Sequence, residues 1–344
     1  MLLESDLIPF TLAPPVGNKS IVLSPHPDDE TLGCGGTIRL LLKSKKHVKV
    51  VFLTSGDKAD PSNNLQHIVP SPLAGEGKGE GGFSNESHIT EYALIREKEA
   101  VKALSVLGVS DYEFFRFPDR ELSAYYEDVL ERLLKIVESY MPDTIYSPSM
   151  IELNPDHRTT EALSMELQKT IMRTNTSTLI PKLSDFNPPP LAPPARGGDL
   201  YRYSLPLKGR GDVPPIHPSP SSGEDEGRDD APPSIPPPQV GRVREGVMPL
   251  RLVFYEITTP LRPNILIDIT SVYNKKKQAI KKYKSQLKLT DYLRHITSLN
   301  TIRSLTLNGP QYVEAFWCVD KPLNEEDIAK WLSYQREFSG HLPY

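Results

Sequence analysis

The first residues that could do chemistry form a dense polar run, His-Pro-Asp-Asp-Glu, at positions 26–30. His26, Asp28 and Asp29 lie within four residues of one another, directly after a short apolar run at 20–25 that predicts a buried strand. An imidazole nitrogen and a carboxylate oxygen are donors that a divalent cation such as zinc accepts. The run therefore predicts half of a metal site.

A second polar run, Asn-Pro-Asp-His-Arg at 154–158, supplies the other half. It follows a predicted strand at 144–147 and offers His157 and another carboxylate, Asp156. The polar site of a parallel sheet lies at the carboxyl ends of its strands, so this run and His26 can converge. Two histidines and one carboxylate leave coordination positions open for water and substrate, which a catalytic metal site requires.

The elements that must position these runs alternate between strand and helix. Short apolar or β-branched stretches predict strands, and apolar residues at helical spacing predict helices. The predicted strands are 20–25, 48–53, 113–116, 144–147, 251–257, 264–269 and 311–319, and the predicted helices are 38–42, 91–107, 125–140 and 271–287. This order indicates βαβ units, hence an α/β fold with a mainly parallel sheet, which the strands after 249 extend.

Two stretches interrupt this order. Residues 181–249 hold 17 of the 34 prolines, and residues 61–88 are rich in glycine. Both contain the pattern P-S-P-x-x-G-E-x-x-G, at 70–79 and 218–227. Such compositions bury too little apolar surface to offset ordering entropy, so we interpret both stretches as disordered low-complexity insertions in surface loops. The rest of 1–344 is enough for a single domain with one core.

Composition excludes several classes of protein. The 40 Lys+Arg against 44 Asp+Glu argue against a nucleic-acid binder, which is usually basic. No apolar run approaches the roughly 18 residues of a membrane span, and the N-terminus does not resemble a secretory signal. Two cysteines are too few for a disulfide framework and suit a reducing cytoplasm. Whether the chain forms a homo-oligomer is left open.

The pairing of the two polar runs resembles the LmbE-like, or PIG-L, family of zinc-dependent N-acetylglucosaminyl deacetylases. Further stretches match that family in order along nearly all the chain outside the two insertions, namely 96–100, 107–109, 117–119, 255–257, 259–261, 267–270 and 312–316. The resemblance implies a Rossmann-like three-layer sandwich. It also implies a hydrolase that removes the N-acetyl group from an N-acetylglucosamine-containing small molecule or glycoconjugate.

Carried over residue by residue, the resemblance makes His26, Asp29 and His157 the ligands of a zinc ion. It makes Asp28 the general base, which takes a proton from the attacking water and returns it to the leaving amine. The structural alternative is that Asp28 or Glu30 simply caps the following helix. Fe(II) is the alternative metal, because two histidines and a carboxylate also suit a non-haem iron enzyme.

Four further residues receive roles. Asp156 is expected to orient or charge a neighbour, as carboxylates beside metal ligands do, and Arg96, Asp119 and Asn154 are expected to contact the substrate. Asn154 departs from many family members, which have histidine there, so no proton-carrying role is expected of it. The alternatives are a solvated pair of Arg96 with Glu99, and a turn role for Asp119 after Pro118.

Three competing functions stay open at this stage. The chain could be an amidase for a larger amide or a thiol conjugate, a non-haem Fe(II) oxygenase, or a binding protein without catalysis. Asp28 beside the ligands favours hydrolysis, since an oxygenase needs no base there. The lysines of helix 271–287, at 275–277, 281, 282 and 284, are interpreted as a solvated face.

Overall fold

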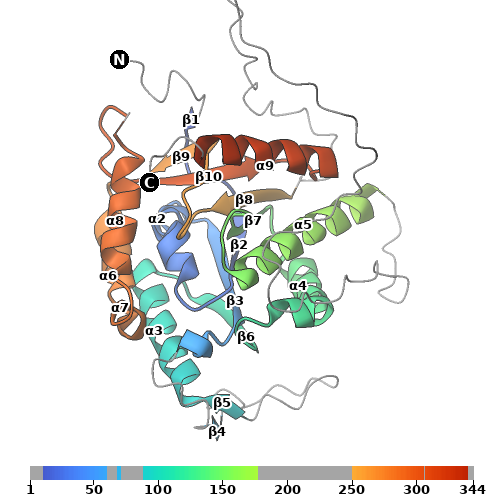
Figure 1. Cartoon of the computed structure of the whole chain (residues 1–344), viewed down its shortest axis with the longest axis vertical. Coiled ribbons are helices and arrows are strands. Elements are labelled where there is room, and N and C mark those ends of the chain that lie inside the picture. The colour runs from blue at the N-terminus through green and yellow to red at the C-terminus, as the bar shows by residue number, and fades with distance from the viewer. Residues whose placement is uncertain (1–10, 60–67, 71–87, 177–249, 306, 340–344) are drawn as a thin grey trace, which may run out of the picture. The chain divides into compact units, whose positions relative to one another are not determined.

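An eight-stranded sheet forms the centre of the described part of the chain (Figure 1). The computed structural model describes residues 11–59, 68–70, 88–176, 250–305 and 307–339. The strand order is β1-β9-β10-β8-β7-β2-β3-β6. The strands are β1 (Thr11–Leu12), β2 (Lys19–Ser24), β3 (His47–Thr54), β6 (Asp111–Phe117), β7 (Thr144–Pro148), β8 (Arg251–Tyr255), β9 (Ile265–Asp268) and β10 (Val313–Val319). Neighbouring strands are parallel except β10, which is antiparallel to both β8 and β9.

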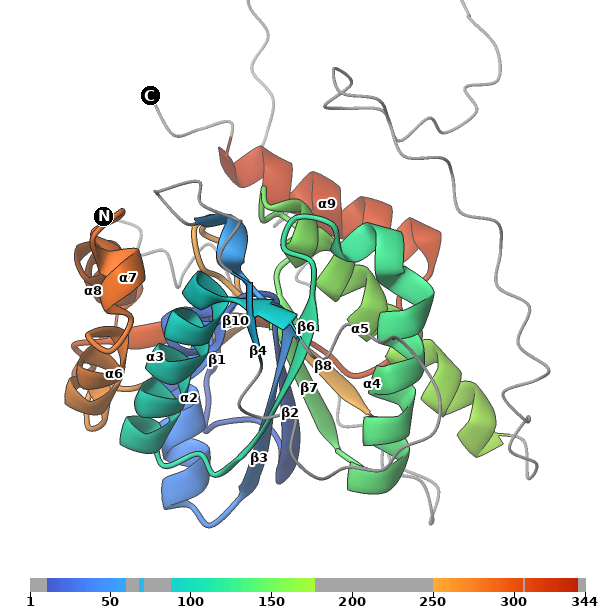
Figure 2. The same ribbon diagram turned by 90° about the horizontal axis from the view of Figure 1, so that it is seen from below.

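Helices cover both faces of this sheet and make three layers (Figures 1 and 2). One face carries α2 (Asp29–Lys43), α3 (Glu91–Leu107), α6 (Tyr273–Ile280), α7 (Lys284–Leu287) and α8 (Tyr292–Ile302). The other carries α4 (Tyr126–Tyr140) and α5 (Pro155–Thr176), and α9 (Glu325–Ser339) joins that side through Trp331 against Trp317 of β10. Two apolar cores result, one on each face of the sheet.

The predicted α/β class and mainly parallel sheet are confirmed. Each of the seven predicted strands is present within three residues of its predicted ends. Most of them are buried apolar runs, whereas β6 alternates aromatic and charged residues and has one buried position. The strands after 249 extend the same sheet, as expected. In the described part of the chain no helix is long and apolar enough to cross a membrane.

Helix α2 differs from its prediction because it starts at Asp29 rather than 38 and contains the glycines. Those glycines allow close packing instead of a turn. A Cβ on Gly33 would lie 2.2 Å from the Tyr255 ring, and one on Gly36 would lie 2.6 Å from Ile269. The helix can therefore lie directly against the sheet only with glycine at both positions.

Helix α2 also has a kink at Cys34, whose φ of −135° is not helical. The kink leaves the N–H groups of Gly36 and Thr37 free to donate to the Glu314 carboxylate, each at 2.8 Å. Lys276 of α6 neutralises that carboxylate at 2.6 Å, and both charged side chains are fully buried. The solvated-face interpretation is therefore wrong for Lys276, although most of the other lysines in this stretch are exposed.

The predicted helix 271–287 is broken into α6 and α7. Tyr283 lies at the break with non-helical ψ of 61°, and its hydroxyl donates to Glu30 of α2 at 2.5 Å. Tyr283 cannot have this backbone conformation inside a continuous helix. The helix is therefore interrupted at the residue that makes the contact with Glu30. The buried positions Val272, Ile280 and Tyr283 lie inward as predicted.

The two predicted insertions fall largely outside the described residues. All of 181–249 does, and so does 61–88 apart from residues 68–70 and 88. There, β4 (Ile68–Pro70) pairs antiparallel with β5 (His88–Thr90), where a loop was expected. Both short strands contain β-branched apolar residues, which favour strand pairing.

Candidate metal centre and active site

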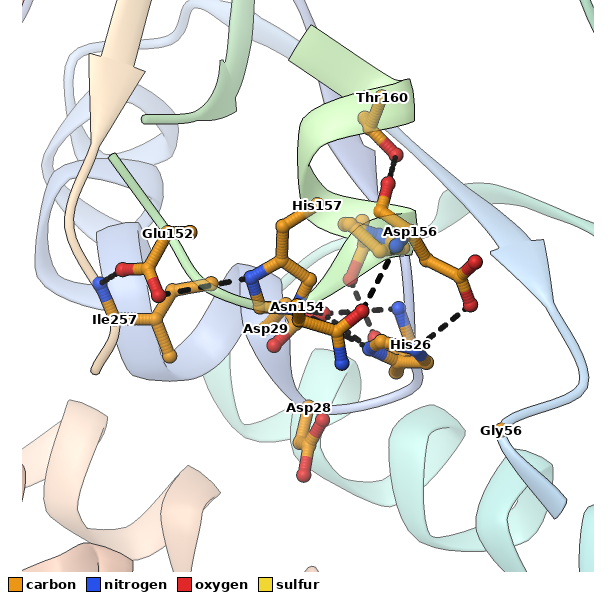
Figure 3. Close-up of polar contacts among 12 residues, drawn as sticks. His26, Asp28, Asp29, Gly56, Glu152, Asn154, Asp156, His157, Thr160 and Ile257 are labelled. Atoms are coloured by element: carbon orange, nitrogen blue, oxygen red, sulfur yellow. Dashed lines mark hydrogen bonds and ion pairs between the residues drawn. The ribbon is translucent and has the colours of Figure 1, made fainter. Parts of the chain in front are cut away.

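The candidate site lies where the carboxyl ends of three parallel strands meet. His26 follows β2, the loop with Asp119 follows β6, and His157 lies in the first turn of α5 after β7. β2 and β7 are neighbours in the sheet, so His26 and Asp156, 130 residues apart in the chain, face each other (Figure 3). The sheet topology thus brings together the residues that the sequence analysis singled out.

His26, Asp29 and His157 present three donor atoms to one point, and we call these atoms the metal cluster. His26 Nδ1 lies 3.0 Å from Asp29 Oδ2 and 3.3 Å from His157 Nε2, and His157 Nε2 lies 3.1 Å from Asp29 Oδ2. Ligands about 2.1 Å from a tetrahedral metal lie roughly 3.4 Å apart, so these distances fit a bound zinc after a small expansion. All three residues are buried, and their donor set suits zinc or iron.

The other nitrogen of His26 faces two carboxylates. Nε2 lies 3.2 Å from Asp156 Oδ2 and 3.3 Å from Asp119 Oδ1. With Nδ1 on a metal, Nε2 carries the proton and donates it to these oxygens. Asp156 is itself fixed by the backbone N–H groups of Arg120 and Leu122. Asp156 therefore lies within hydrogen-bonding distance of His26, and its expected role in orienting a ligand stays a prediction.

Asp119 also contacts His26, although the sequence predicted only a substrate contact for it. Its Oδ1 faces His26 and its Oδ2 accepts from the Lys58 N–H at 2.9 Å. It also lies in a turn after Pro118, as the alternative reading expected. Asp119 borders the cavity at the site, but both of its oxygens already have protein partners.

Glu152 stands behind His157 and was missed in the sequence analysis. Its Oε2 lies 3.8 Å from His157 Nδ1, and its Oε1 accepts from the N–H groups of Ile257, Thr258 and Thr259 at 2.8–3.2 Å. It is almost completely buried. One signal was available, since a glutamate only two residues before the Asn-Pro-Asp-His-Arg run is close enough to share its site.

Asp28 lies apart from the metal cluster, on the side of the open cavity (Figure 3). It takes the N-cap position of α2, but its side chain makes no capping hydrogen bond, so the capping alternative is wrong for Asp28. Its φ of 151° is rare for any residue with a side chain. Burial raises the pKa of Asp28 to about 7, although the Arg96 cation acts against that rise.

Arg96 is buried and pairs with Asp28, with Nη2 at 3.0 Å from Oδ1. It also donates to the carbonyls of Gly56 and Pro27 at 2.6 and 2.8 Å. The alternative of a solvated pair with Glu99 is wrong, because Glu99 instead accepts from Ser285. Gly56 is required here, since its φ is +63° and a Cβ would lie 2.3 Å from the guanidinium.

Asn154 begins helix α5. Its Oδ1 accepts from the Asp156 N–H at 2.8 Å, which is the hydrogen bond of a helix N-cap. Asn154 also borders the cavity, so its amide nitrogen is the group left for a substrate. The cap holds the turn that carries Asp156 and His157.

The charges of the metal cluster compensate one another. Burial lowers the pKa of His26, but hydrogen bonds to Asp119, Asp156 and Asp29 outweigh it and hold the pKa well above 6.5. Burial also opposes the protonation of His157, whose pKa Asp29 nevertheless raises to about 9. A metal ion must therefore displace protons, and its affinity rises with pH.

A cavity of about 200 Å³ opens over these residues, and we call it the metal cavity. His26, Asp28, Asp29, Arg96, Asp119, Asn154 and His157 border it, together with Gln286 of α7 and Tyr292 of α8. Neither of these two residues was predicted, because Tyr292 lies in α8, which no pattern indicated, and no motif marks Gln286. The metal cavity thus combines three candidate metal donors with the Asp28 carboxylate and the buried Arg96 cation that pairs with it.

The fold and this His–Asp–His cluster define an α/β protein with a candidate catalytic metal centre. Residues 21–168 match the family described as PIG-L: GlcNAc-PI de-N-acetylase, and this segment contains both polar runs. Over this segment the chain is therefore similar to the PIG-L, or LmbE-like, family.

Two curated relatives are also named as deacetylases. The chain is 28% identical over 151 residues to the diacetylchitobiose deacetylase of Thermococcus kodakarensis, covering 43% of this chain and 48% of that protein. It is 29% identical over 140 residues to a probable N-acetyl-alpha-D-glucosaminyl L-malate deacetylase 2 of Bacillus cereus, covering 40% and 52%. The chain thus spans about half the length of these relatives.

Solved structures share the fold over most of the chain. The N,N'-diacetylchitobiose deacetylase from Pyrococcus horikoshii has a TM-score of 0.52 at 23% identity, covering 92% of this chain and 90% of that one. GalB, the 4-carboxy-2-hydroxymuconate hydratase from Pseudomonas putida, has a TM-score of 0.53 at 20% identity, covering 89% and 98%. Because a deacetylase and a hydratase share this fold, the activity must be argued from the site.

Proposed function

We propose that the chain is a metal-dependent N-deacetylase that acts on an N-acetylglucosamine-containing small molecule or glycoconjugate. The observation that carries this proposal is the metal cluster with Asp28 beside it in one cavity. The family's description and the names of two curated relatives support the amino-sugar substrate.

His26, Asp29 and His157 would hold the metal, and zinc is the metal we propose. When bound, the ion supplies a lowered pKa to water and positive charge for the acyl oxygen. Asp28 takes the proton from the attacking water, because its carboxylate lies in the cavity rather than among the donor atoms. The carboxylic acid so formed returns that proton to the leaving amine.

The neighbouring residues hold this arrangement in place. Asp156 and Asp119 fix the ring of His26 through Nε2, and Glu152 faces Nδ1 of His157. Arg96 stabilises the ionised form of Asp28 at 3.0 Å. Each catalytic group thus has a charged or polar partner that limits its orientation.

Two alternatives differ from this proposal in metal or in substrate. Fe(II) suits the same donors, but Asp28 beside the cluster favours hydrolysis over oxygen chemistry. A larger amide is the alternative substrate. Both cysteines are free and buried, which supports the proposed cytoplasmic location.

The test is acetate release from N-acetylglucosamine derivatives, with chelator and after zinc or iron is added back. We expect activity to disappear with chelator and to return with zinc. Asp28→Asn should lower kcat by roughly 10²–10⁴-fold with metal content unchanged. Asp111→Asn, which changes an exposed aspartate in β6, is the matched control. Full activity in chelator, or in Asp28→Asn, would contradict the proposal.

A further inference from the structure

Glu152 contacts two parts of the molecule that the site needs, a metal ligand and the wall of the metal cavity. Its Oε2 lies 3.8 Å from Nδ1 of His157. Its Oε1 accepts from the N–H groups of Ile257, Thr258 and Thr259, which follow β8. Ile257 and Thr258 border the metal cavity. One carboxylate therefore joins the centre that would hold the metal to a wall that would face the substrate.

A turn after β7 fixes the backbone of Glu152. The N–H of Ser149 donates to the carbonyl of Tyr255 at the end of β8, and the N–H of Glu152 donates to the carbonyl of Ser149 at 3.1 Å. The chain then reaches His157, in the first turn of α5, five residues later. The side chain of Glu152 is completely buried, and a carboxylate can be buried in the ionised form only with donors around it. The fold therefore sets the position of this carboxylate.

The proton on Nδ1 decides whether the ring of His157 can bind a metal. A neutral imidazole has one N–H, so a metal on Nε2 requires that proton to be on Nδ1. Nδ1 is buried and makes no hydrogen bond to the residues that the structure describes. Oε2 of Glu152 lies just beyond hydrogen-bonding distance of it, and an ionised carboxylate can only accept. A shift of about 1 Å would complete the hydrogen bond and hold the ring in its metal-binding tautomer.

We infer that Glu152 is a positioning residue, which selects the metal-binding tautomer of His157 and joins this ligand to the loop 257–259 of the cavity wall. The inference rests on the metal centre of the proposed function and adds to it a residue from outside the two polar runs. Glu152 lies behind the residues that border the metal cavity. It therefore acts through His157 on the affinity for the metal, and through Thr258 on the shape of the cavity.

Glu152→Gln separates the two contacts of this side chain. The amide oxygen can still accept from the three N–H groups of the loop, whereas the amide nitrogen replaces Oε2 and can only donate. A donor that faces Nδ1 favours the tautomer with the proton on Nε2, and that tautomer cannot bind a metal through Nε2. The zinc Kd of the full chain, measured by competition with a chromophoric chelator, should therefore rise by about 10–100-fold. The visible spectrum of the cobalt(II) form, which reports ligand geometry, should change as well.

Glu256→Gln is the matched control. Glu256 is a buried carboxylate of the same wall, where it accepts from the Leu261 N–H at 2.9 Å and pairs with Arg303 at the end of α8. These contacts fix the loop to α8 rather than to a metal ligand, so Glu256→Gln should leave the zinc Kd and the cobalt(II) spectrum unchanged. If Glu152 only anchors the loop, Glu152→Gln should also keep the wild-type zinc Kd, because its amide oxygen retains the loop contacts.

A measurement on wild type tests the inference if Glu152→Gln does not fold. In the zinc-loaded chain, the Nδ1–H proton of His157 should be visible by nitrogen-edited NMR, because burial and the hydrogen bond to Glu152 slow its exchange with water. Rapid exchange of that proton would overturn the inference. So would an unchanged zinc Kd in Glu152→Gln, or an equal loss of zinc affinity in Glu152→Gln and Glu256→Gln.

These measurements do not depend on acetate release, so they separate the inference from the proposed function. A loss of zinc affinity in Glu152→Gln alone, in a chain that deacetylates nothing, would refute the proposed function and support the role of Glu152. Deacetylation by wild type together with wild-type zinc affinity in Glu152→Gln would refute the role of Glu152 and leave the function. A wild-type chain that binds no zinc would refute both.

Discussion

Removal of the Arg96 cation should move the pH dependence of the enzyme, because Arg96 is the buried cation beside the proposed base. Its Nη2 lies 3.0 Å from Asp28 Oδ1. A cation stabilises the carboxylate over the carboxylic acid, so Arg96 lowers the pKa of Asp28. Arg96→Gln should raise that pKa, and since only the carboxylate acts as base, the acidic limb of kcat/KM should move to higher pH.

The size of the effect follows from the distance. Two unit charges 3.0 Å apart interact by about 5.5 kcal/mol at an effective dielectric constant near 20, before the cost of burying both charges is subtracted. Aspartates beside an arginine usually have a pKa lowered by about 1–3. We therefore expect the acidic limb to move up by about 1–3 pH units in Arg96→Gln. A bound metal lowers the pKa of Asp28 in wild type and in Arg96→Gln alike. The test is therefore the difference in pH between the acidic limbs of the two proteins.

The assay is kcat/KM against pH for wild type, Arg96→Gln and Arg96→Lys, with metal content measured in each. Arg96→Lys keeps the charge but loses part of the hydrogen bonding to Gly56 and Pro27. It should lower the plateau with little movement of the limb. If Arg96→Gln lowers activity by the same factor at every pH, Arg96 only holds the loop, and the electrostatic reasoning is refuted.

Three further predictions concern the metal, a buried acid and the buried ion pair. His157→Ala should lose bound zinc by elemental analysis, since it removes one of three protein donors; full occupancy would exclude it as a ligand. Burial raises the pKa of Glu161 to about 8. Between about pH 4.5 and pH 8 the folded state keeps a proton that the unfolded state has released. The free energy of unfolding therefore falls as the pH rises through this range. Glu161→Gln should remove that fall and raise the free energy of unfolding at pH 8 by at least about 1 kcal/mol, checked by urea unfolding at pH 5 and 8; an unchanged pH dependence would contradict it. Lys276→Met should cost about 3–5 kcal/mol because Glu314 is left buried and charged, while Lys276→Met with Glu314→Gln should cost less; equal losses in the two proteins would show that the charges are not coupled.

The sequence predicted the sheet and the chemistry at its edge because both are local signals. Buried strands appear as apolar runs, and the two polar runs sit directly after β2 and β7. The pairing of β2 with β7, which the structure supplies, then brings His26 and His157 together. The order of the strands in the sheet was outside this reasoning, since it depends on which helices can cover which face.

The misses share a different physical cause, which is tertiary contact overriding local preference. Glycines usually end helices, but Gly33 lies inside α2 because only a glycine fits against Tyr255. Lys276 was predicted to be solvent-exposed because lysine side chains are rarely buried. Its position, four residues after Val272 and four before Ile280, is on the apolar side of the helix and could have revealed its burial.

The parts of the site that came from distant segments could not be predicted from motifs. Gln286 and Tyr292 reach the metal cavity only because α7 and α8 pack beside α3 and α6. No spacing between either residue and the two polar runs indicates this. The substrate-facing wall is therefore the part of the site that needed the structure.

The backbone conformation at Asp28 makes the proposed catalytic base costly for the stability of the fold. Its φ of 151° is a conformation that glycine adopts at little cost, whereas strain of this kind costs other residues about 1–3 kcal/mol. Replacement of this aspartate by glycine would relieve the backbone and remove a buried acid in one step. A lineage freed from the need for catalysis would therefore gain stability by losing Asp28 while its metal ligands stayed intact. In sequences related to this one, glycine at this position beside a complete set of ligands would mark a chain that has kept the fold and given up the reaction.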